Sequence, residues 1–381
     1  MNIVVVNSGS SSLKMSMFQT DTGIVPPTAV WDDEQDVDWQ ASDPAEIERK
    51  ISKHLAQLWE GDRPILKSPE DIALVGHRIV HGGARYSQPV ELKPSVVQDL
   101  QKLNEFAPLH NPINLKSLHL VQKLLPKARH IAVFDTAFHC TLKPEAAVYP
   151  GPYSWFSDWN IKKYGFHGIS HKYCSAKAAR MLARNQLRLV SCHLGGGCSL
   201  AAIQDGISIE TTMGFTPLDG LMMRSRSGAV DPGILIYLLK NNKYTVDELD
   251  RVLNKDSGMK GIFERSADLR DITKAMLAGD DRAKLTFDMF VHRLAAGIAS
   301  MVAALGGIDA LLFTGGIGEH SAHVRAATCK KLSFLNLAID EKENESNPID
   351  KDVAQVDSIV RILVVKARED WQIASECTSF A

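Results

Sequence analysis

The chain has 381 residues, more than one hydrophobic core ordinarily supports, so we expect two or three domains. Its 43 Lys and Arg residues nearly balance 45 Asp and Glu residues. This balance argues against nucleic acid or an anionic membrane as a partner and favours a small molecule. The six cysteines contain no CxxC pair, and the apolar run Met1–Val6 is too short for a signal peptide, which predicts a cytoplasmic protein with reduced thiols.

The N-terminal segment predicts two short strands. Ile3–Val6 is a β-branched run, and Leu13–Phe18 alternates apolar and polar residues. The small polar residues between them are typical of a turn, so the expected order is strand, turn, strand. Trp31–Glu48 is acidic and has no clear period, and we expect it to be a solvated, irregular segment.

Four further elements are expected before residue 136. The spacing of apolar residues predicts helices over Ile47–Trp59 and Pro94–Phe106. The apolar runs Ile72–Val80 and Ile131–Phe134 predict buried strands, and the second of these ends at Asp135.

A Gly-rich turn in the middle of the chain repeats the N-terminal pattern. The expected strand Leu187–His193 is followed by Gly195, Gly196 and Gly197 and then by the expected strand Ser199–Ile203. Compared with the N-terminal segment, the second turn is one residue longer. The match indicates an internal duplication but is too short to establish it.

A third Gly-rich turn, Gly315–Glu319, follows the expected strand Ala310–Thr314 and precedes a helical segment. Backbone N–H groups of such a turn can bind an anion. One such turn is more often structural, but three in one chain favour a nucleotide. Since the P-loop and dinucleotide motifs are both missing, we expect two hairpin phosphate loops, as in the actin-like kinases. The preceding apolar run Leu294–Leu305 is too short for a membrane span and predicts a buried helix.

Eight motifs along nearly the whole chain resemble the acetate kinase family, within the superfamily of acetate and sugar kinases, heat-shock chaperones and actin. No single motif is decisive, but their order and spacing leave little room for chance. The motifs are NSGSSSLK (7–14), GHRIVHGG (76–83), APLHNPIN (107–114), VFDTAFH (133–139), YGFHGISH (164–171), HLGGGCS (193–199), TTMGFTPLDGLMM (211–223) and FTGGIGE (313–319).

The resemblance implies an α/β fold of two related ribonuclease-H-like (actin-like ATPase) domains. The first would comprise residues 1–136 with 371–381, and the second, nucleotide-binding domain would comprise residues 137–370. It also implies an active-site cleft between the domains, which closes to keep water from the phosphoryl group, and a homodimer.

The resemblance further implies reversible, direct in-line transfer of the γ-phosphoryl group of ATP to acetate, giving acetyl phosphate and ADP. Acetate is already ionised, so the protein has to bring two anions together and stabilise charge on the phosphoryl oxygens, with Mg²⁺ or Mn²⁺ on the phosphates. The alternatives are a propionate kinase, or a kinase with another phosphate donor. An alternative from another class is a non-catalytic nucleotide-binding protein of this fold, which the retained charged residues argue against.

The residues implied as catalytic are two arginines, two histidines and an aspartate. Arg78 and Arg226 would hold the carboxylate and the migrating phosphoryl group, because a guanidinium binds oxyanions with two donors; surface ion pairs are the alternative for each. His167 would donate a hydrogen bond in the transition state, and His110 would help to place the phosphoryl group. The spacing of His167 and His171 leaves a helical metal pair as the alternative.

The implied metal site consists of Asn7, Asp135 and Glu369, and Asp135 is also implied as catalytic. Mg²⁺ needs only one or two carboxylates from a protein when it is bound to phosphate oxygens. For Glu369 the alternative is an acidic residue favoured by the dipole at a helix N-terminus, and both roles can hold at once.

The nucleotide is expected to contact both phosphate loops and two later segments. Side chains of the first loop can hydrogen-bond a magnesium-bound anion. The small pair Gly306 and Gly307 leaves room for a base, which favours ATP over pyrophosphate. The implied ATP-binding residues are Ser10, Ser12, Lys14, His193, Leu194, Gly195, Gly196, Gly197, Asp268, Leu269, Arg270, Gly316, Ile317 and Gly318.

The pocket for the acyl group is expected to be small and apolar, with acetate as the first candidate and propionate as the second. One extra methylene in such a pocket changes binding by only about 1–3 kcal/mol. The implied substrate-binding residues are Arg78, Val80, Leu109, Phe166 and Pro217.

Three positions depart from the family pattern. Gly196 stands where the family loop His-Leu-Gly-Asn-Gly has Asn, Ala229 stands where Asp is usual, and Arg368 begins a segment that usually reads Asn-Glu-Glu. All three lie on the nucleotide side. They are therefore expected to change the affinity for the phosphate donor, or its identity, rather than the reaction class.

Overall fold

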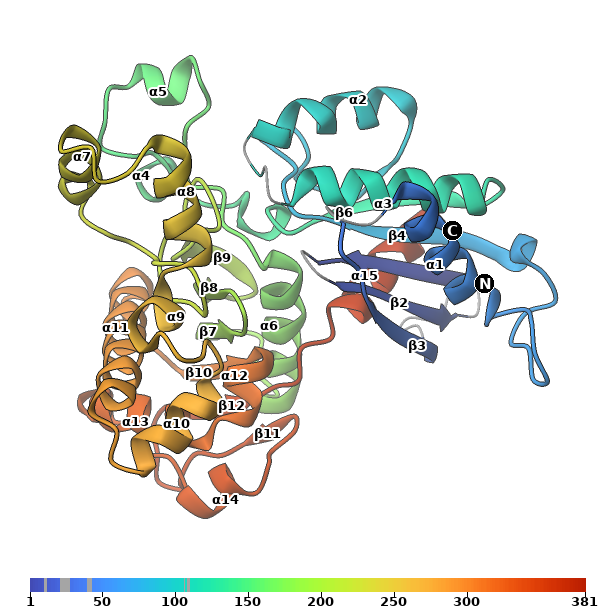
Figure 1. Ribbon diagram of the computed structural model, residues 1–381. Helices are drawn as coiled ribbons and strands as arrows, with labels where there is room; N and C mark the ends of the chain where they lie inside the picture. Colours follow the sequence, from blue (N-terminus) through green and yellow to red (C-terminus); the bar gives the residue numbers. More distant parts are fainter. Residues whose placement is uncertain (10–11, 21–27, 40–42, 106, 108–109) are drawn as a thin grey trace. The chain divides into compact units, whose positions relative to one another are not determined.

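The chain forms two compact units in the computed structural model (Figure 1), which describes all residues except 10–11, 21–27, 40–42, 106 and 108–109. The first unit comprises Met1–Phe138 and Arg368–Ala381, and the second comprises His139–Ala367. The sequence analysis placed Glu369 in the second domain, at a boundary after residue 370. In the structure it belongs to the first unit, because the C-terminal helix that begins there packs on the first sheet.

The first unit is built on a six-stranded sheet with the strand order β3-β2-β1-β4-β6-β5. β1, β2 and β3 form an antiparallel meander, β4 and β6 continue the sheet parallel to β1, and β5 is antiparallel to β6. The strands are β1 (Asn2–Ser8), β2 (Ser12–Gln19), β3 (Thr28–Asp36), β4 (Ile72–Ile79), β5 (Val90–Glu91) and β6 (Arg129–Phe134).

Helices cover both faces of this sheet. Alternate residues of a strand point to opposite faces, so Val4 and Val6 pack with α1 and α3, whereas Val5 and Gly76 face α15. A Cβ added at Gly76 would lie 2.6 Å from Ile373 and 2.8 Å from Cys377, so the glycine allows α15 to approach the sheet. The helices are α1 (Pro44–Ala56), α2 (Pro94–Lys102), α3 (Asn111–Leu124) and α15 (Glu369–Cys377).

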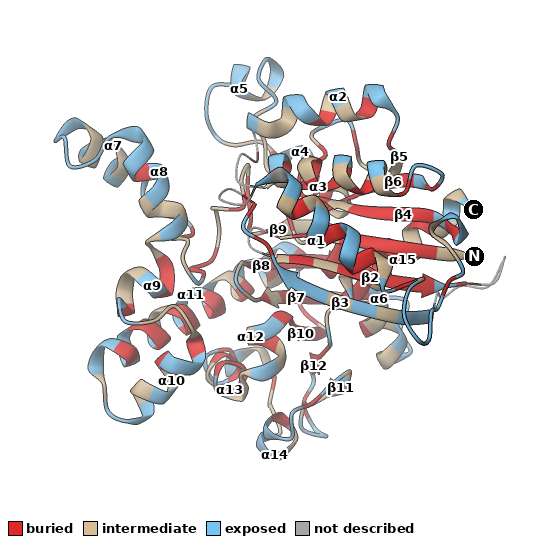
Figure 2. Cartoon of the chain, turned by 45° about the vertical axis from the view of Figure 1, so that its right-hand side comes forward, coloured by how far each residue is buried: buried red, intermediate tan, exposed pale blue. Residues whose placement is uncertain are grey.

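The prediction of an irregular segment over Trp31–Glu48 is wrong. Residues 28–36 form β3, and α1 begins at Pro44. β3 is an edge strand that pairs with β2 while most of its side chains stay exposed (Figure 2), so it lacks the apolar alternation by which strands are recognised. The other elements expected in this unit are confirmed, although the helix predicted over Pro94–Phe106 ends at Lys102 and continues as a 3₁₀ turn.

The second unit contains a sheet of the same topology, with the order β11-β12-β10-β7-β8-β9. β7, β8 and β9 form an antiparallel meander, β10 and β12 run parallel to β7, and β11 is antiparallel to β12. This shared order confirms the indication of an internal duplication. The strands are β7 (Arg188–Leu194), β8 (Cys198–Gln204), β9 (Ile207–Thr211), β10 (Ala310–Thr314), β11 (Lys351–Asp352) and β12 (Arg361–Val364).

The helices of the second unit include α11, which by length and composition alone could cross a membrane. Its buried residues, among them Phe290, Leu294 and Ile298, instead form part of the core, and α11 packs on β8 and on neighbouring helices. The predicted buried helix over Leu294–Leu305 is thus confirmed and is longer than expected. The helices are α4 (Pro144–Ala147), α5 (Ser154–Ser157), α6 (Gly168–Leu182), α7 (Pro232–Lys240), α8 (Val246–Lys255), α9 (Gly258–Phe263), α10 (Leu269–Leu277), α11 (Asp281–Leu305), α12 (Gly315–His320), α13 (Ala322–Lys331) and α14 (Glu341–Glu345).

Candidate active site

Three predicted residues meet at one edge of the first sheet. Asn7 lies near the end of β1, Arg78 near the end of β4 and Asp135 directly after β6, and these strands run parallel. Arg78 donates from Nε and Nη2 to the two carboxylate oxygens of Asp135 at 3.2 and 2.5 Å, and from Nη1 to Oδ1 of Asn7 at 3.2 Å. The carboxyl ends of parallel strands are a common place for ligand sites in α/β sheets.

The first turn of α15 adds two carboxylates to this edge. Asn7 Nδ2 donates to Glu369 at 3.5 Å and to Asp370 at 3.4 Å. Asp370 also accepts a hydrogen bond from Ser16 at 2.9 Å and forms an ion pair with Lys14 at 2.8 Å. Asn7 therefore joins the Arg78–Asp135 pair to the acidic start of α15. Glu369 is also the first residue of α15, which agrees with the alternative of an acidic residue favoured at a helix N-terminus.

The electrostatics of this edge keep its cations charged. Burial would lower the pKa of Arg78, but the carboxylates of Asp135 and Glu369 outweigh it and raise the pKa above the usual value. Burial likewise opposes the charge of Lys14, and Asp370 is the main cause of its raised pKa. The two cationic side chains at this edge are thus held in place by carboxylates.

The donor set at this edge suits a hard divalent cation. Asp135, Glu369 and Asn7 offer carboxylate and amide oxygens, which are the ligands that Mg²⁺ accepts in proteins, and Mg²⁺ keeps several waters. Within the described residues there is no group of three or more His, Cys, Asp and Glu side chains that could hold a metal on its own. The site therefore fits an ion that takes its remaining ligands from phosphate and water.

A second group of polar residues lies between the first turn of α6 and the sheet of the second unit. His167 is the N-cap of α6, in the left-handed conformation (φ 55°), and its Nδ1 is 2.9 Å from Ser199 Oγ. Its ring stacks on that of His193 with centroids 4.3 Å apart, and His193 Nδ1 is 2.8 Å from Ser170 Oγ. Ser199 and His193 are paired residues of β8 and β7, so both point toward α6.

His171 lies one turn further along α6 and is fully buried. Its Nε2 is 2.8 Å from Ser199 Oγ, and its Nδ1 is 2.9 Å from Ser191 Oγ. Burial, and then the neighbouring His139 and His193, lower the pKa of His171 well below its usual value. Both ring nitrogens are engaged by serine hydroxyls, so the alternative that His167 and His171 form a metal pair is wrong.

The glycine loop between β7 and β8 brings His167 and Arg226 together. A Cβ added at Gly197 would lie 3.2 Å from His167 Cε1 and Nε2 and 3.5 Å from Arg226 Nη1. Arg226 Nη1 also donates to the Pro217 carbonyl at 3.2 Å, and burial lowers the pKa of the guanidinium, with Cys198 opposing that shift. The two predicted catalytic side chains therefore converge on one position of the loop.

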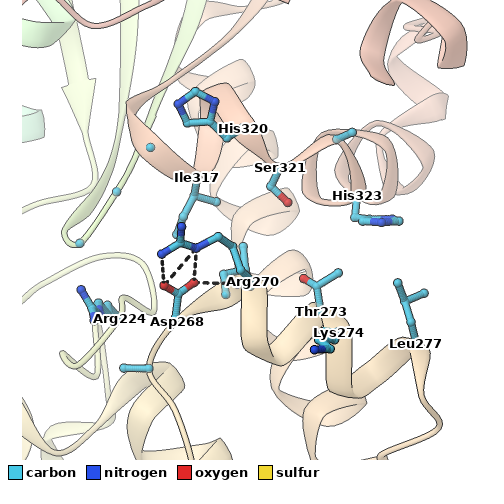
Figure 3. Close-up of a pocket in the computed structure, with 16 residues that line it drawn as sticks. Arg224, Asp268, Arg270, Thr273, Lys274, Leu277, Ile317, His320, Ser321 and His323 are labelled. Atoms are coloured by element: carbon cyan, nitrogen blue, oxygen red, sulfur yellow. Dashed lines mark hydrogen bonds and ion pairs between the residues drawn. The ribbon is translucent and has the colours of Figure 1, made fainter. Parts of the chain in front are cut away.

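A cavity of about 840 Å³ lies between α10 on one side and α12 and α13 on the other (Figure 3). Arg270 folds back onto Asp268, with Nη2 2.6 Å from the carboxylate, and this contact is the main cause that lowers the Asp268 pKa to about 2. The residues that line the cavity are Gly195, Gly196, Arg224, Ala267, Asp268, Leu269, Arg270, Thr273, Lys274, Leu277, Gly316, Ile317, His320, Ser321, Ala322 and His323.

The chain matches the Acetokinase family over residues 2–375. It belongs to that family. It is 50% identical to the acetate kinase of Cyanothece sp., over 99% of this chain and 98% of that protein. The acetate kinase of Porphyromonas gingivalis has a TM-score of 0.87 at 33% identity, and a propionate kinase of Francisella tularensis has 0.85 at 34%; these matches cover 99% and 98% of both chains.

Membership of the acetokinase family confirms the predicted family and enzyme class, a phosphotransferase with a carboxyl group as acceptor. The relatives span the whole chain, and their fold agrees with the two related α/β units described above. The alternative hypothesis, that the chain is a non-catalytic protein of this fold, has no support in these comparisons.

The remaining predicted residues fall into three groups. Ser10 and Leu109 lie outside the described residues. Leu194 and Gly318 are buried and are not among the residues that line the cavity, and their roles stay predictions. The others keep their predicted roles as predictions: Val80 is buried in the first unit, Phe166 and Pro217 are buried in the second, Ser12 begins β2 and His110 is the N-cap of α3.

Several polar residues at the edge of the first sheet and beside α6 were not predicted. They are Asp370 in the first unit and Ser170, Ser191 and Ser199 in the second. A signal exists for Ser191, since it and the predicted His193 occupy alternate positions of an otherwise apolar strand, and such polar positions share a face. Asp370 could not be recognised as a partner of Asn7, because 363 positions separate them in the sequence.

Proposed function

We propose that the chain transfers the γ-phosphoryl group of ATP to acetate. A carboxylate oxygen of acetate forms a bond to the γ-phosphorus as the bond to the β,γ-bridging oxygen breaks, which gives acetyl phosphate and ADP, and the reverse reaction uses the same groups. The observation that carries the proposal is the convergence of His167 and Arg226 on the glycine loop that also lines the cavity of the second unit.

In this proposal each unit supplies one set of groups. The cavity of the second unit holds the nucleoside, with Asp268–Arg270 and Ile317 along its walls. His167 and Arg226 donate to the phosphoryl oxygens, where negative charge accumulates in the transition state. In the first unit, Arg78 binds an oxyanion of the acceptor with its planar guanidinium, already oriented by Asp135.

We also propose a Mg²⁺ requirement. Asp135 and Glu369, with Asn7, are the residues that would hold the ion, and the ion would neutralise charge on the phosphate oxygens. Replacing Glu369 by Gln should raise the Mg²⁺ concentration for half-maximal activity, and a titration of activity with Mg²⁺ measures it.

The test of the function is a hydroxamate assay for acetyl phosphate with ATP, Mg²⁺ and acetate. We expect activity for the wild type and a loss of at least about 100-fold for Arg226→Ala, as for other groups that stabilise transition-state charge. Lys284→Ala is the control, because among the described residues this side chain forms only an exposed ion pair with Asp288. Absence of acetyl phosphate with the wild type would refute the proposal.

Propionate is the second candidate acceptor, since one solved relative is a propionate kinase. A small apolar pocket separates homologous acids weakly, because one methylene is worth about 1–3 kcal/mol. Steady-state kinetics with acetate, propionate and butyrate, and then with ATP, GTP and pyrophosphate, identify the preferred acceptor and donor by their kcat/KM ratios.

We propose that the protein is a homodimer in which α7 lies at the contact. α7 has the apolar sequence PGILIYLLK and no buried residue (Figure 2), and Ile234, Ile236 and Tyr237 are 51, 53 and 60% exposed. Apolar side chains gathered on one helix are typical of protein contacts. Light scattering should give a dimer for the wild type and a monomer for Ile236→Glu, whereas Leu285→Glu, another exposed position, should stay dimeric.

A further inference from the structure

Two imidazoles of the second unit share one arrangement toward the glycine loop Gly195–Gly197. His167 and His193 each have Nδ1 against a serine hydroxyl, Ser199 at 2.9 Å and Ser170 at 2.8 Å. Their Nε2 atoms lie on the loop side, 3.2 and 3.8 Å from where a Cβ of a loop residue would stand. The serines are therefore behind the rings, and the other nitrogen faces the position of the phosphates in the proposed function.

Behind His167 the contacts continue as a series. Ser199 Oγ lies between His167 Nδ1 and His171 Nε2, at 2.9 and 2.8 Å, and His171 Nδ1 is 2.9 Å from Ser191 Oγ. All members but His167 are fully buried, with no exposed surface on Ser191, Ser199 or His171. A hydroxyl has one proton, so the direction of one hydrogen bond in the series fixes the direction of the others.

The direction is set at Ser191. Among the described residues, His171 Nδ1 is the only hydrogen-bond partner of the Ser191 hydroxyl. A buried donor left without an acceptor is costly, whereas a spare lone pair is tolerated. Burial lowers the pKa of His171 well below its usual value, so the ring is neutral and one of its nitrogens can accept. Ser191 therefore donates to Nδ1, and His171 carries its proton on Nε2.

The positions of the other protons in the series follow from the proton on His171 Nε2. His171 Nε2–H donates to Ser199 Oγ, and the Ser199 hydroxyl donates to His167 Nδ1. We propose that Ser191, His171 and Ser199 are positioning residues that fix neutral His167 as the Nε2–H tautomer, so that it donates to the transferring phosphoryl group without being protonated. This inference rests on the proposed function for the role of the donor, but the tautomer itself follows from the series of contacts.

A neutral donor suits the surroundings of His167. Within the described part of the chain, the charged or titratable groups that face it include Arg226 across Gly197, His193 stacked on its ring, and His171 through Ser199. A second positive charge beside Arg226 would be unfavourable. Without the serines, a neutral imidazole would divide between two tautomers, and only one of them presents an N–H to the loop.

The direct test is ¹⁵N NMR of the histidine rings of the full-length wild type at pH 8, with His167 assigned by comparison with His167→Gln. We expect Nε2 of His167 to be protonated and Nδ1 to be unprotonated. Protonation of Nδ1 instead would overturn the inference. This measurement needs no turnover, so its result is independent of whether the proposed acetate reaction is found.

The kinetic test compares Ser199→Thr with Ser199→Val, because these side chains have nearly the same shape and differ in the hydroxyl. At pH 8 we expect the Val variant to lose about 10- to 100-fold in kcat with the KM for ATP within about threefold, and the Thr variant to stay near the wild type. An unchanged kcat for the Val variant, or equal losses for the Thr and Val variants, would overturn the inference.

Discussion

At the scale of single residues, Gly197 shows how the lack of a side chain brings two functional groups together. A Cβ in this position would lie 3.2 Å from the His167 ring and 3.5 Å from Arg226. We therefore expect Gly197→Ala to displace the His167 ring by a few tenths of an ångström, with Arg226 in ordinary contact, and to lower kcat by about 10- to 100-fold, because small displacements of aligned groups are costly. Gly196→Ala is the matched control in the same assay, since nothing lies within 4 Å of its Cβ position. Equal kcat values for the two variants would contradict this account.

Gly196 allows the opposite kind of change, the addition of a contact. It lines the cavity, and there is open space for a side chain, in a loop where the family usually has Asn. We expect Gly196→Asn to strengthen ATP binding by about 1.5–3 kcal/mol, the worth of one hydrogen bond to a charged group. Isothermal titration calorimetry with ATP measures this, and Gly196→Ala should show no gain because it lacks the amide. An unchanged affinity for the Asn variant would mean that the loop contacts the phosphates in another way.

At the scale of elements, α12 depends on a buried arginine. Arg325 is 1% exposed and donates from Nη1 to the carbonyls of Gly318 and Glu319 at 2.9 and 2.8 Å. It also donates to Asn344 at 2.7 Å, and burial lowers its pKa to about 10. The side chain thus satisfies the carbonyls at the end of the helix that forms one wall of the cavity.

Replacing Arg325 by Met should leave these carbonyls buried without a donor. We expect the second unit to lose about 2–4 kcal/mol of unfolding free energy and the KM for ATP to rise. Urea denaturation and steady-state kinetics measure the two effects. Lys284→Ala, which removes an exposed ion pair, should change the unfolding free energy by less than about 0.5 kcal/mol. A destabilised variant with an unchanged KM would show that α12 does not set the shape of the cavity.

The elements that the sequence predicted correctly are those with strong apolar periodicity. β1, β2, β4 and β6 are buried strands whose pattern is visible in the sequence, and α11 was recognised in part. β3 was not predicted because this strand is stabilised by its pairing with β2 rather than by burial of its side chains. The periodicity of apolar residues in a sequence reflects which side chains are buried. An element that is held mainly by backbone hydrogen bonds therefore has no such periodicity and is not recognised.

For the site, the motifs supplied candidate residues but not the residues that contact them. His167 and Arg226 were predicted, and the structure brings them to the same loop position. Ser199 and Asp370 were not predicted, because their importance depends on which side chains the fold brings beside them. Residues that hold functional groups in place are defined by three-dimensional contact, which a single sequence does not contain.

At the scale of the whole molecule, both units repeat one connection order, and in each the carboxyl ends of the parallel strands carry residues that were predicted for the site. In the first unit these are Asn7, Arg78 and Asp135, and in the second His193 and the turn after Thr314. The two sheets thus present equivalent edges that carry different side chains. The edge of the first sheet carries acidic and cationic side chains, and the edge of the second carries a glycine loop that is contacted by histidines and serines.

Buried histidines in both units predict that the molecule loses stability in mild acid. Burial lowers the pKa of His81 in the first unit and of His139 in the second to about 4. In the unfolded chain both titrate near 6.5, so below that pH the unfolded state binds protons that the folded state does not. Their contribution is complete above about pH 6.5 and falls as the pH is lowered toward 4. We expect a loss of about 2–3 kcal/mol per histidine at pH 4.5, measured by urea unfolding of each unit.

The variant His139→Gln isolates one of these groups. It removes a ring that hydrogen-bonds Ser208 and the Phe166 carbonyl, so the second unit should be less stable at pH 7.5 than in the wild type. Between pH 6 and 4.5, however, its unfolding free energy should fall less steeply, by about 1.4 kcal/mol per pH unit, because one proton fewer is taken up on unfolding. His292→Gln, at an exposed position of α11, should leave the slope as it is. An identical slope for His139→Gln and the wild type would show that His139 is protonated in the folded state, against the burial that surrounds it.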